Sequence, residues 1–223
     1  MEQALIIITA IVIGVGMTYV KHRQNKKKIA ELTRLTQQRG WTYTERDDSL
    51  ADRFVGEPFG KGFDRQAWHI LRGNHRGREV LAFEYVYHEH RGGGDKRHTV
   101  TYRNLVASLR TPAPRPTLEL SRKGFGRRLL GIVGVRDLRL ESEEFNKAFL
   151  IRTENDRFAY DVLHPRMMEW MLSDARAGRL PFRYAWGDLL TWEEGPLDAG
   201  RAMFMLEYLC DIIDQVPAFV WKD

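Results

Sequence analysis

The stretch ALIIITAIVIGVGMTYV, residues 4–20, contains no charged side chain and determines where the rest of the chain is placed. In an α-helix these residues would extend about 25 Å, near the short end of the length that crosses a bilayer. A segment that is apolar on all sides has no suitable place on the surface of a soluble domain. The sequence therefore predicts a transmembrane anchor at residues 1–20.

The charges on either side of this stretch predict its orientation. Glu2 precedes it, and a basic cluster follows it, made up of Lys21, Arg23, Lys26, Lys27 and Lys28. A cleaved signal peptide has the opposite order, with positive charge before the apolar run and a small-residue cleavage site after it. Because Lys and Arg are retained on the cytoplasmic side, we expect a single-pass anchor in the cell membrane. Its N-terminus would lie outside, and the C-terminal domain would be cytoplasmic.

The net charge of +5 belongs to this basic cluster and not to the domain. Residues 21–28 carry five basic side chains and no acid, so residues 29–223 are left with a net charge of only +1. A nucleic-acid-binding protein needs its positive charge on the folded part, so no nucleic-acid partner is expected. The lone Cys210 excludes an intramolecular disulfide and fits a reducing compartment.

The remaining pattern predicts one α+β domain at residues 41–223, joined to the anchor by a basic juxtamembrane helix or stalk at residues 21–40. Ile29, Leu32 and Leu35 recur at helical spacing, and Gly40 is placed to end that helix. Strands are expected at 41–46, 66–73, 78–90, 97–110, 117–122, 149–152, 182–186 and 189–193. Helices are expected at 157–163, 165–176 and 197–215. The fold would be a mainly antiparallel β-sheet of about seven or eight strands packed with helices, ending in a long C-terminal helix.

Two side-chain patterns predict which faces are buried or paired. On the strand at 78–90, alternation predicts that one set of side chains faces the core: Leu81, Phe83, Tyr85 and Tyr87. On the last helix, Glu207, Asp211 and Asp214 form an acidic stripe. Acids late in a helix oppose its dipole, so we expect basic partners for this stripe on the facing elements.

Histidine is the only residue type with catalytic or metal-binding chemistry that clusters. His88 and His90 point to the same side of one strand, together with Glu84, and His98 lies across the hairpin. Zinc accepts such a set, so His88, His90 and Glu84 form a candidate metal site. An H-x-H pair on a hairpin is more often a solvated polar face, and the adjoining RGGGDKR tip disfavours a pre-organised site. No nucleotide-binding, metalloprotease or hydrolase motif is present, so no catalytic residue and no cofactor is predicted.

Basic residues provide a second candidate site, a surface for anionic lipid. The juxtamembrane cluster lies where such a surface would be, and the segment 122–133 interleaves apolar residues with arginines as interfacial helices do. The candidate lipid contacts are Lys21, Arg23, Lys26, Lys27, Lys28, Arg127 and Arg128. The simpler interpretation is that the juxtamembrane charges only fix the topology.

The stretch EFNKAFLIRTENDRFAYDVLHPRMMEWML, residues 144–172, resembles a segment of uncharacterised bacterial membrane-anchored proteins that are classed as domains of unknown function. The resemblance implies a membrane anchor and a cytoplasmic α+β domain, and it implies no catalytic residue. With the anchor and the near-neutral domain, it favours a non-enzymatic interaction or scaffold module with an unknown protein partner and an unknown oligomeric state. Anionic-lipid recognition and a metal-dependent enzyme remain as alternatives.

Overall fold

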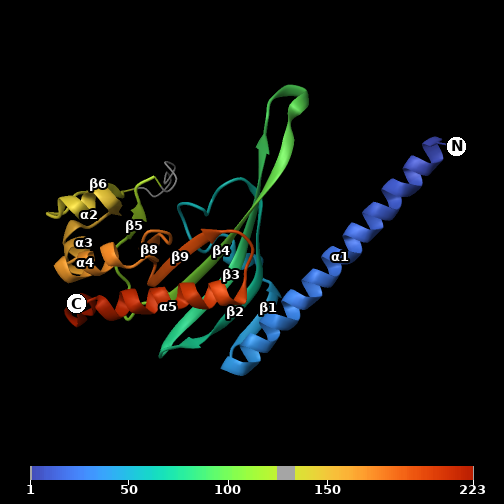
Figure 1. Ribbon diagram of the computed structural model, residues 1–223. Coiled ribbons are helices and arrows are strands. Elements are labelled where there is room, and N and C mark those ends of the chain that lie inside the picture. Colours follow the sequence, from blue (N-terminus) through green and yellow to red (C-terminus); the bar gives the residue numbers. More distant parts are fainter. Residues whose placement is uncertain (1, 125–133, 223) are drawn as a thin grey trace.

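A nine-stranded antiparallel sheet forms the centre of the protein (Figure 1). The computed structural model describes residues 2–124 and 134–222, with the side chains of residues 2–15, 17, 18, 21 and 95 excepted. The strand order is β1-β2-β3-β4-β9-β8-β5-β7-β6. The strands are β1 (Thr42–Arg46), β2 (Phe63–His75), β3 (Arg78–Arg91), β4 (His98–Arg110), β5 (Leu118–Arg122), β6 (Arg136–Leu138), β7 (Phe149–Thr153), β8 (Phe182–Ala185) and β9 (Asp188–Glu194).

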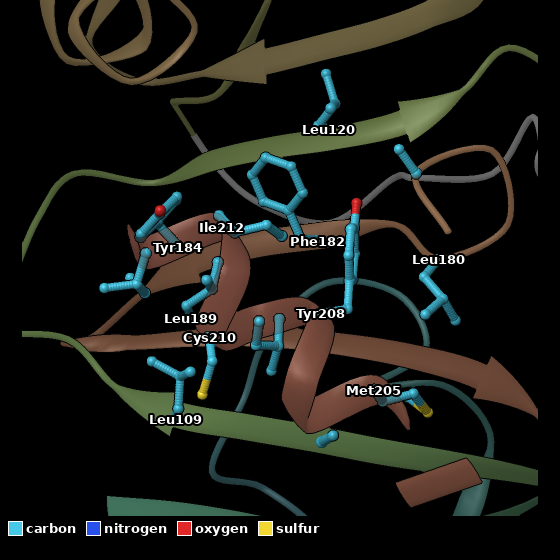
Figure 2. Close-up of a cluster of buried hydrophobic side chains, with 14 of the residues drawn as sticks. Leu109, Leu120, Leu180, Phe182, Tyr184, Leu189, Met205, Tyr208, Cys210 and Ile212 are labelled. Atoms are coloured by element: carbon cyan, nitrogen blue, oxygen red, sulfur yellow. The ribbon is translucent and has the colours of Figure 1, made fainter. Parts of the chain in front are cut away.

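Five α-helices are described, and all of them contribute to the hydrophobic core on one face of this sheet. They are α1 (Glu2–Arg39), α2 (Glu143–Ala148), α3 (Asp156–Val162), α4 (Pro165–Ser173) and α5 (Ala199–Gln215). Helix α5 crosses the centre of the sheet, and its apolar side chains pack with residues of β4, β5, β8 and β9 (Figure 2). Cys210 lies within this core, where burial raises the pKa of its thiol. The α+β class and the long C-terminal helix are therefore confirmed.

Local signals explain where the shorter helices begin. Asn155 caps α3, because its side chain accepts a hydrogen bond from the Phe158 amide at 2.9 Å. His164 caps α4 in the same way through the Met167 amide, and Pro165 occupies the first helical position, where its missing N–H costs nothing. Asp198 caps α5 through the Arg201 amide at 2.8 Å. The segment 144–172 thus owes its conformation to caps and buried apolar residues.

The second face of the sheet carries a smaller core. Its outer cover is the segment 47–62, which includes the short 3-10 helix η1 (Asp48–Leu50). The residues predicted to face the core lie here, packed beneath that cover: Leu81, Phe83, Tyr85 and Tyr87. Val80 and Ala82, on the opposite side of β3, belong to the larger core under the helices. The prediction of one buried face was therefore incomplete, because β3 is buried on both faces along its middle.

The β3–β4 hairpin extends well beyond the rest of the sheet (Figure 1). Its strands pair with each other as far as Arg91 and His98. Pairing of β3 with β2 stops at His88, and pairing of β4 with β9 stops at Asn104. In the described part of the chain, the outer end of this hairpin is therefore a two-stranded ribbon without a third strand beside it.

Several element boundaries match the prediction, but one turn is shifted, and helix α2 was not predicted. Gly40, with φ +66°, ends α1 as expected. The turn between β8 and β9 is Trp186-Gly187 and not Gly187-Asp188, because Ala185 pairs with Asp188. Strand β6 was not predicted, since three residues are too few to show alternation. The domain boundaries at 20 and 40 remain predictions, although Leu32 of the predicted stalk is buried in the larger core.

The structure tests the prediction of a membrane anchor only in part. Helix α1 runs without interruption from Glu2 to Arg39. Among the fully described residues, no helix combines the length and apolar character required to cross a membrane. Residues 4–15 of the predicted anchor lie outside that set, because their side chains are not described.

The acidic stripe on α5 has the basic partners that were predicted. Arg76, in the β2–β3 turn, donates to Glu207 at 3.0 Å and to Asp211 at 2.6 Å, and it also donates to Asp214. Arg78 reaches Asp214 as well, and His75 lies 2.8 Å from Glu207. Arg176 pairs with Asp211 from the segment after α4. This network joins α5 to the end of the β2–β3 hairpin.

We expect Arg76→Met to lower the free energy of unfolding by about 1 kcal/mol, because one guanidinium serves three carboxylates at a partly exposed site. Arg139→Met is the matched control, since Arg139 has a single exposed partner, Glu143, and should cost at most about 0.5 kcal/mol. Urea unfolding of both variants measures the difference. Equal losses would show that the network adds nothing beyond ordinary surface pairs.

Candidate functional site

A cavity of about 970 Å³ lies between α1 and the sheet. Helix α1 provides one wall through His22, Gln24, Asn25 and Lys28, and Pro196 lies at its edge. The floor is the helix-side face of β2, β3 and β4, and it contains Trp68, His69, Glu84, Val86, His88 and Arg103. The lining is polar and aromatic, with imidazoles from three separate elements.

Glu84 is the most constrained group of this cavity. Its side chain is 1% exposed and accepts hydrogen bonds from three segments of the chain. Lys28 Nζ of α1 lies 2.6 Å from Oε2, the Leu197 amide lies 2.9 Å from the same oxygen, and Arg103 of β4 donates to Oε1. Charged side chains are rarely fully buried unless they are paired, and here two cations and one amide satisfy a single carboxylate.

The ionisation of Glu84 follows from these contacts. Burial by itself raises the pKa of the carboxyl group, because a low-dielectric environment disfavours the charged form. The hydrogen bonds from Lys28, Leu197 and Arg103 outweigh that effect, so the pKa of Glu84 lies below its ordinary value of 4.5. The carboxylate is therefore charged at neutral pH, and it holds α1, β4 and the segment before α5 against β3.

His69 occupies an unusual backbone position beside this ion cluster. The register between β2 and β3 shifts between Trp68 and Leu71, and His69 in this bulge has φ +54°. A hydrogen bond of 2.9 Å joins its Nδ1 to the Tyr43 hydroxyl. Burial lowers the pKa of His69, with the Lys28 charge acting in the same direction, so its imidazole is neutral at neutral pH. Burial raises the pKa of Tyr43 to about 12, so that hydroxyl keeps its proton.

The structure does not bring the candidate metal ligands together. Glu84 and His88 are four residues apart on one strand, which separates them by about 13 Å. His88 contacts the Thr101 hydroxyl at 3.0 Å and Asp64 at 3.5 Å, whereas the ring of His90 packs on Phe63 at 4.5 Å between centroids. In the described residues, no group of three or more His, Cys, Asp or Glu is placed to hold a metal ion. Glu84 already accepts hydrogen bonds from Lys28, Arg103 and the Leu197 amide, so its carboxylate is not free to bind a metal ion.

The candidate lipid contacts fall into three groups. Arg23, Lys26 and Lys27 are exposed on α1. Lys28 is half-buried and bound to Glu84 at 2.6 Å, and its role as a lipid contact stays a prediction. The side chain of Lys21 lies outside the described residues, as do Arg127 and Arg128. Of the segment 122–133, the structure describes only residues 122–124, so membrane contact by this segment stays a prediction.

The sequence carried a signal for this site that the histidine cluster obscured. Glu84 stands alone in VLAFEYVY, a run that is otherwise apolar. Such an isolated acid in a buried strand predicts a buried ion pair. The identity of its partners, Lys28 and Arg103, could not be read from the sequence, because Lys28 lies 56 positions away and is surrounded by other basic residues.

Comparisons with known proteins bear on the fold alone. No family model matches the chain, and no curated protein matches it in sequence. A structural match is the crystal structure of the mycobacterial trehalose monomycolate transport factor A, with a TM-score of 0.58 and 15% sequence identity. The match covers 83% of this chain and 94% of the other. The two proteins therefore share a fold.

We expect Glu84→Gln to lower the free energy of unfolding at pH 7 by about 2–3 kcal/mol, because it leaves Lys28 and Arg103 without their carboxylate. Lys28→Met should cost less, since Arg103 and Leu197 remain bound. In a double-mutant cycle, the two substitutions should show a coupling energy of at least about 1 kcal/mol. Additive losses in urea unfolding would contradict the pairing.

The same carboxylate should shape the pH dependence of stability. Because the folded-state pKa of Glu84 lies below the unfolded-state value, its contribution is fully present above the unfolded-state value. It is lost as the pH falls from about 4.5 through the folded-state pKa. The difference in unfolding free energy between the wild type and Glu84→Gln should therefore shrink steadily below pH 4.5. A constant difference over that range would show that ionisation of Glu84 does not stabilise the fold.

Proposed function

We propose that the protein is a membrane-tethered interaction module, whose domain is held at a fixed orientation on the cytoplasmic side by α1 and presented to a protein partner. The observation that supports this most directly is the ion pair between Lys28 and buried Glu84. The residues before Lys28 include the apolar stretch 4–20, and α1 is continuous through both. The anchor and the first helix of the domain would be one continuous helix, and the ion pair binds that helix to the sheet. The orientation of the anchor would therefore fix the orientation of the sheet.

The spacing along α1 supports a position of the domain close to the proposed membrane. Eight residues separate Val20 from Lys28, which corresponds to about 12 Å along the helix. The cavity wall formed by His22, Gln24 and Asn25 falls within that interval. A module with this geometry would offer its cavity and the sheet edge around it to a partner in or next to the bilayer.

The structural neighbour is compatible with this role. It is named as a transport factor. We carry over that type of role and no substrate, because the likeness is one of fold. Among the charged groups of the site, Lys28 and Arg103 both bind Glu84. This arrangement is that of a structural joint between segments.

Recognition of an anionic lipid surface is the second candidate function. Arg23, Lys26 and Lys27 are exposed within about 11 Å of the end of the apolar stretch. Each basic residue at such a position contributes about 1 kcal/mol to binding an anionic bilayer. Lys28 does not belong to this exposed set, since it is half-buried and bound to Glu84.

To test the anchor, we would replace Ile8 and Ile11 together by lysine. Two charges near the middle of a membrane helix cost about 5–7 kcal/mol of insertion free energy, so the double variant should move from the membrane pellet to the soluble fraction after alkaline extraction. The wild type should remain in the pellet. A wild type that is extracted as readily as the variant would refute the proposed tether.

The soluble double variant also separates the two candidate functions. Recognition of lipid by the basic residues requires that this variant still float with vesicles containing phosphatidylglycerol. That binding should fall about 100-fold when Arg23, Lys26 and Lys27 become glutamine. The control is Arg139→Gln, which removes an exposed charge far from α1. Equal flotation with neutral and anionic vesicles would leave the interaction module as the remaining candidate.

A further inference from the structure

The outer end of the β3–β4 hairpin, residues 89–99, is the most exposed part of the fold with no assigned role. We call it the hairpin tip. It contains η2 (Gly94–Lys96), and its described side chains are exposed or half-buried. A free two-stranded hairpin is only marginally stable in water, yet this one continues for several residue pairs beyond its neighbours. We propose that the hairpin tip rests on the anionic membrane surface beside α1, as a second contact point, and this rests on the proposed anchor.

The direction of the hairpin supports this contact. In Figure 1, the hairpin tip and the N-terminal part of α1 both extend to the same, upper side of the molecule, and they diverge as they leave the sheet. The ion pair between Glu84 of β3 and Lys28 of α1 joins the two elements, so the length of each can be measured from it. From Glu84 to Arg91, β3 extends about 23 Å. From Lys28 to Val20, α1 extends about 12 Å.

These two lengths compare how far the hairpin tip and the end of the apolar stretch extend from the ion pair. Because the hairpin is inclined to α1, its reach measured along the helix axis is shorter than 23 Å. The inclination therefore reduces the reach of the hairpin toward the distance of about 12 Å that separates Lys28 from the end of the apolar stretch.

The composition of the tip fits an anionic surface. Residues 89–99 contain Arg91, Lys96 and Arg97 against Glu89 and Asp95, so their net charge is +1. His90 and His98 are exposed at the same end of the hairpin. Glu89 pairs with Arg91 at 3.0 Å, which leaves Lys96 and Arg97 against Asp95. Gly92, Gly93 and Gly94 provide no side chains with which to form a shape-specific protein interface, whereas a bilayer surface requires only charge and access.

Aromatic contacts keep the ribbon extended toward that surface. Tyr87 and Tyr102 stack across the two strands at 5.1 Å between ring centroids. The Arg91 guanidinium lies over the Tyr102 ring at 5.8 Å. At the base of the tip, Phe63 is 41% exposed and packs on the rings of His88 and His90. These contacts stabilise the extended conformation of the hairpin.

A reporter at Gly93 tests the contact in the full chain. Gly93 has φ −125°, and a Cβ added there meets nothing within 4 Å, so Gly93→Cys should be tolerated. Cys210 is fully buried and should not react with a thiol dye in the folded protein. The labelled protein would be reconstituted into phosphatidylcholine vesicles with or without phosphatidylglycerol, together with a lipid whose headgroup carries a quencher. Glu169→Cys on α4, which lies away from the N-terminus in Figure 1, provides the control label.

We expect strong quenching at position 93 in phosphatidylglycerol vesicles and weak quenching at position 169. Replacing Lys96 and Arg97 by glutamine should weaken the contact equilibrium about 25-fold, which is about fivefold for each basic residue. Replacing Arg139 and Lys147, exposed on another part of the domain, by glutamine should leave the quenching unchanged. All variants should still float with the vesicles through the anchor.

The outcomes separate this inference from the proposed tether. Flotation without quenching at position 93 would overturn the contact and leave the tether intact. Quenching that is equal in neutral vesicles, or that survives the loss of Lys96 and Arg97, would overturn the electrostatic basis of the contact. Failure of the unmodified full chain to float would overturn both proposals at once.

Discussion

The carboxylate of Glu84 is the constraint on which the arrangement of this protein depends. It lies in the middle of β3, fully buried, and receives Lys28 from α1, Arg103 from β4 and the amide of Leu197 before α5. Four segments that are far apart in sequence therefore meet at two oxygen atoms. Leaving such a group unpaired in the interior is strongly unfavourable, so alternative placements of α1 that remove Lys28 are disfavoured. The contacts of Glu84 therefore determine the direction of α1 relative to the sheet.

A second buried ion pair has the equivalent role on the other face of the sheet. Arg183 of β8 is 1% exposed and binds Glu119 of β5 at 2.7 Å. Its remaining donors reach the backbone carbonyls of Val55 and Glu57 in the covering segment. Each face thus has a buried ion pair that binds its cover, which is α1 in one case and the segment 47–62 in the other. Apolar packing provides most of the stabilisation, whereas these polar joints specify which segment lies where.

The sequence predicted local structure well, because its local signals are strong. Gly40, Pro165 and the alternation along the long strands set element boundaries that the structure confirms, and the acidic stripe of α5 has the basic partners expected for it. The sequence failed where the answer lay in long-range pairing. Alternation cannot show that both faces of β3 are covered, and the turn at Trp186 was misplaced because a bulky residue with φ +57° is uncommon there. For the site, Glu84 was recognised as notable but was assigned to a metal, since a sequence does not reveal which of many cations reaches it.

The most direct test of the account is whether Glu84 sets the direction of α1 relative to the hairpin. Spin labels at Arg23→Cys on α1 and Gly93→Cys on the hairpin tip would span the two elements, and their distance distribution can be measured by double electron–electron resonance in the folded protein. We expect a narrow distribution with Glu84 present and a clearly broader one in the Glu84→Gln variant, with the sheet still folded by circular dichroism. An equally narrow distribution at the same distance in both proteins would show that the direction of α1 does not depend on Glu84.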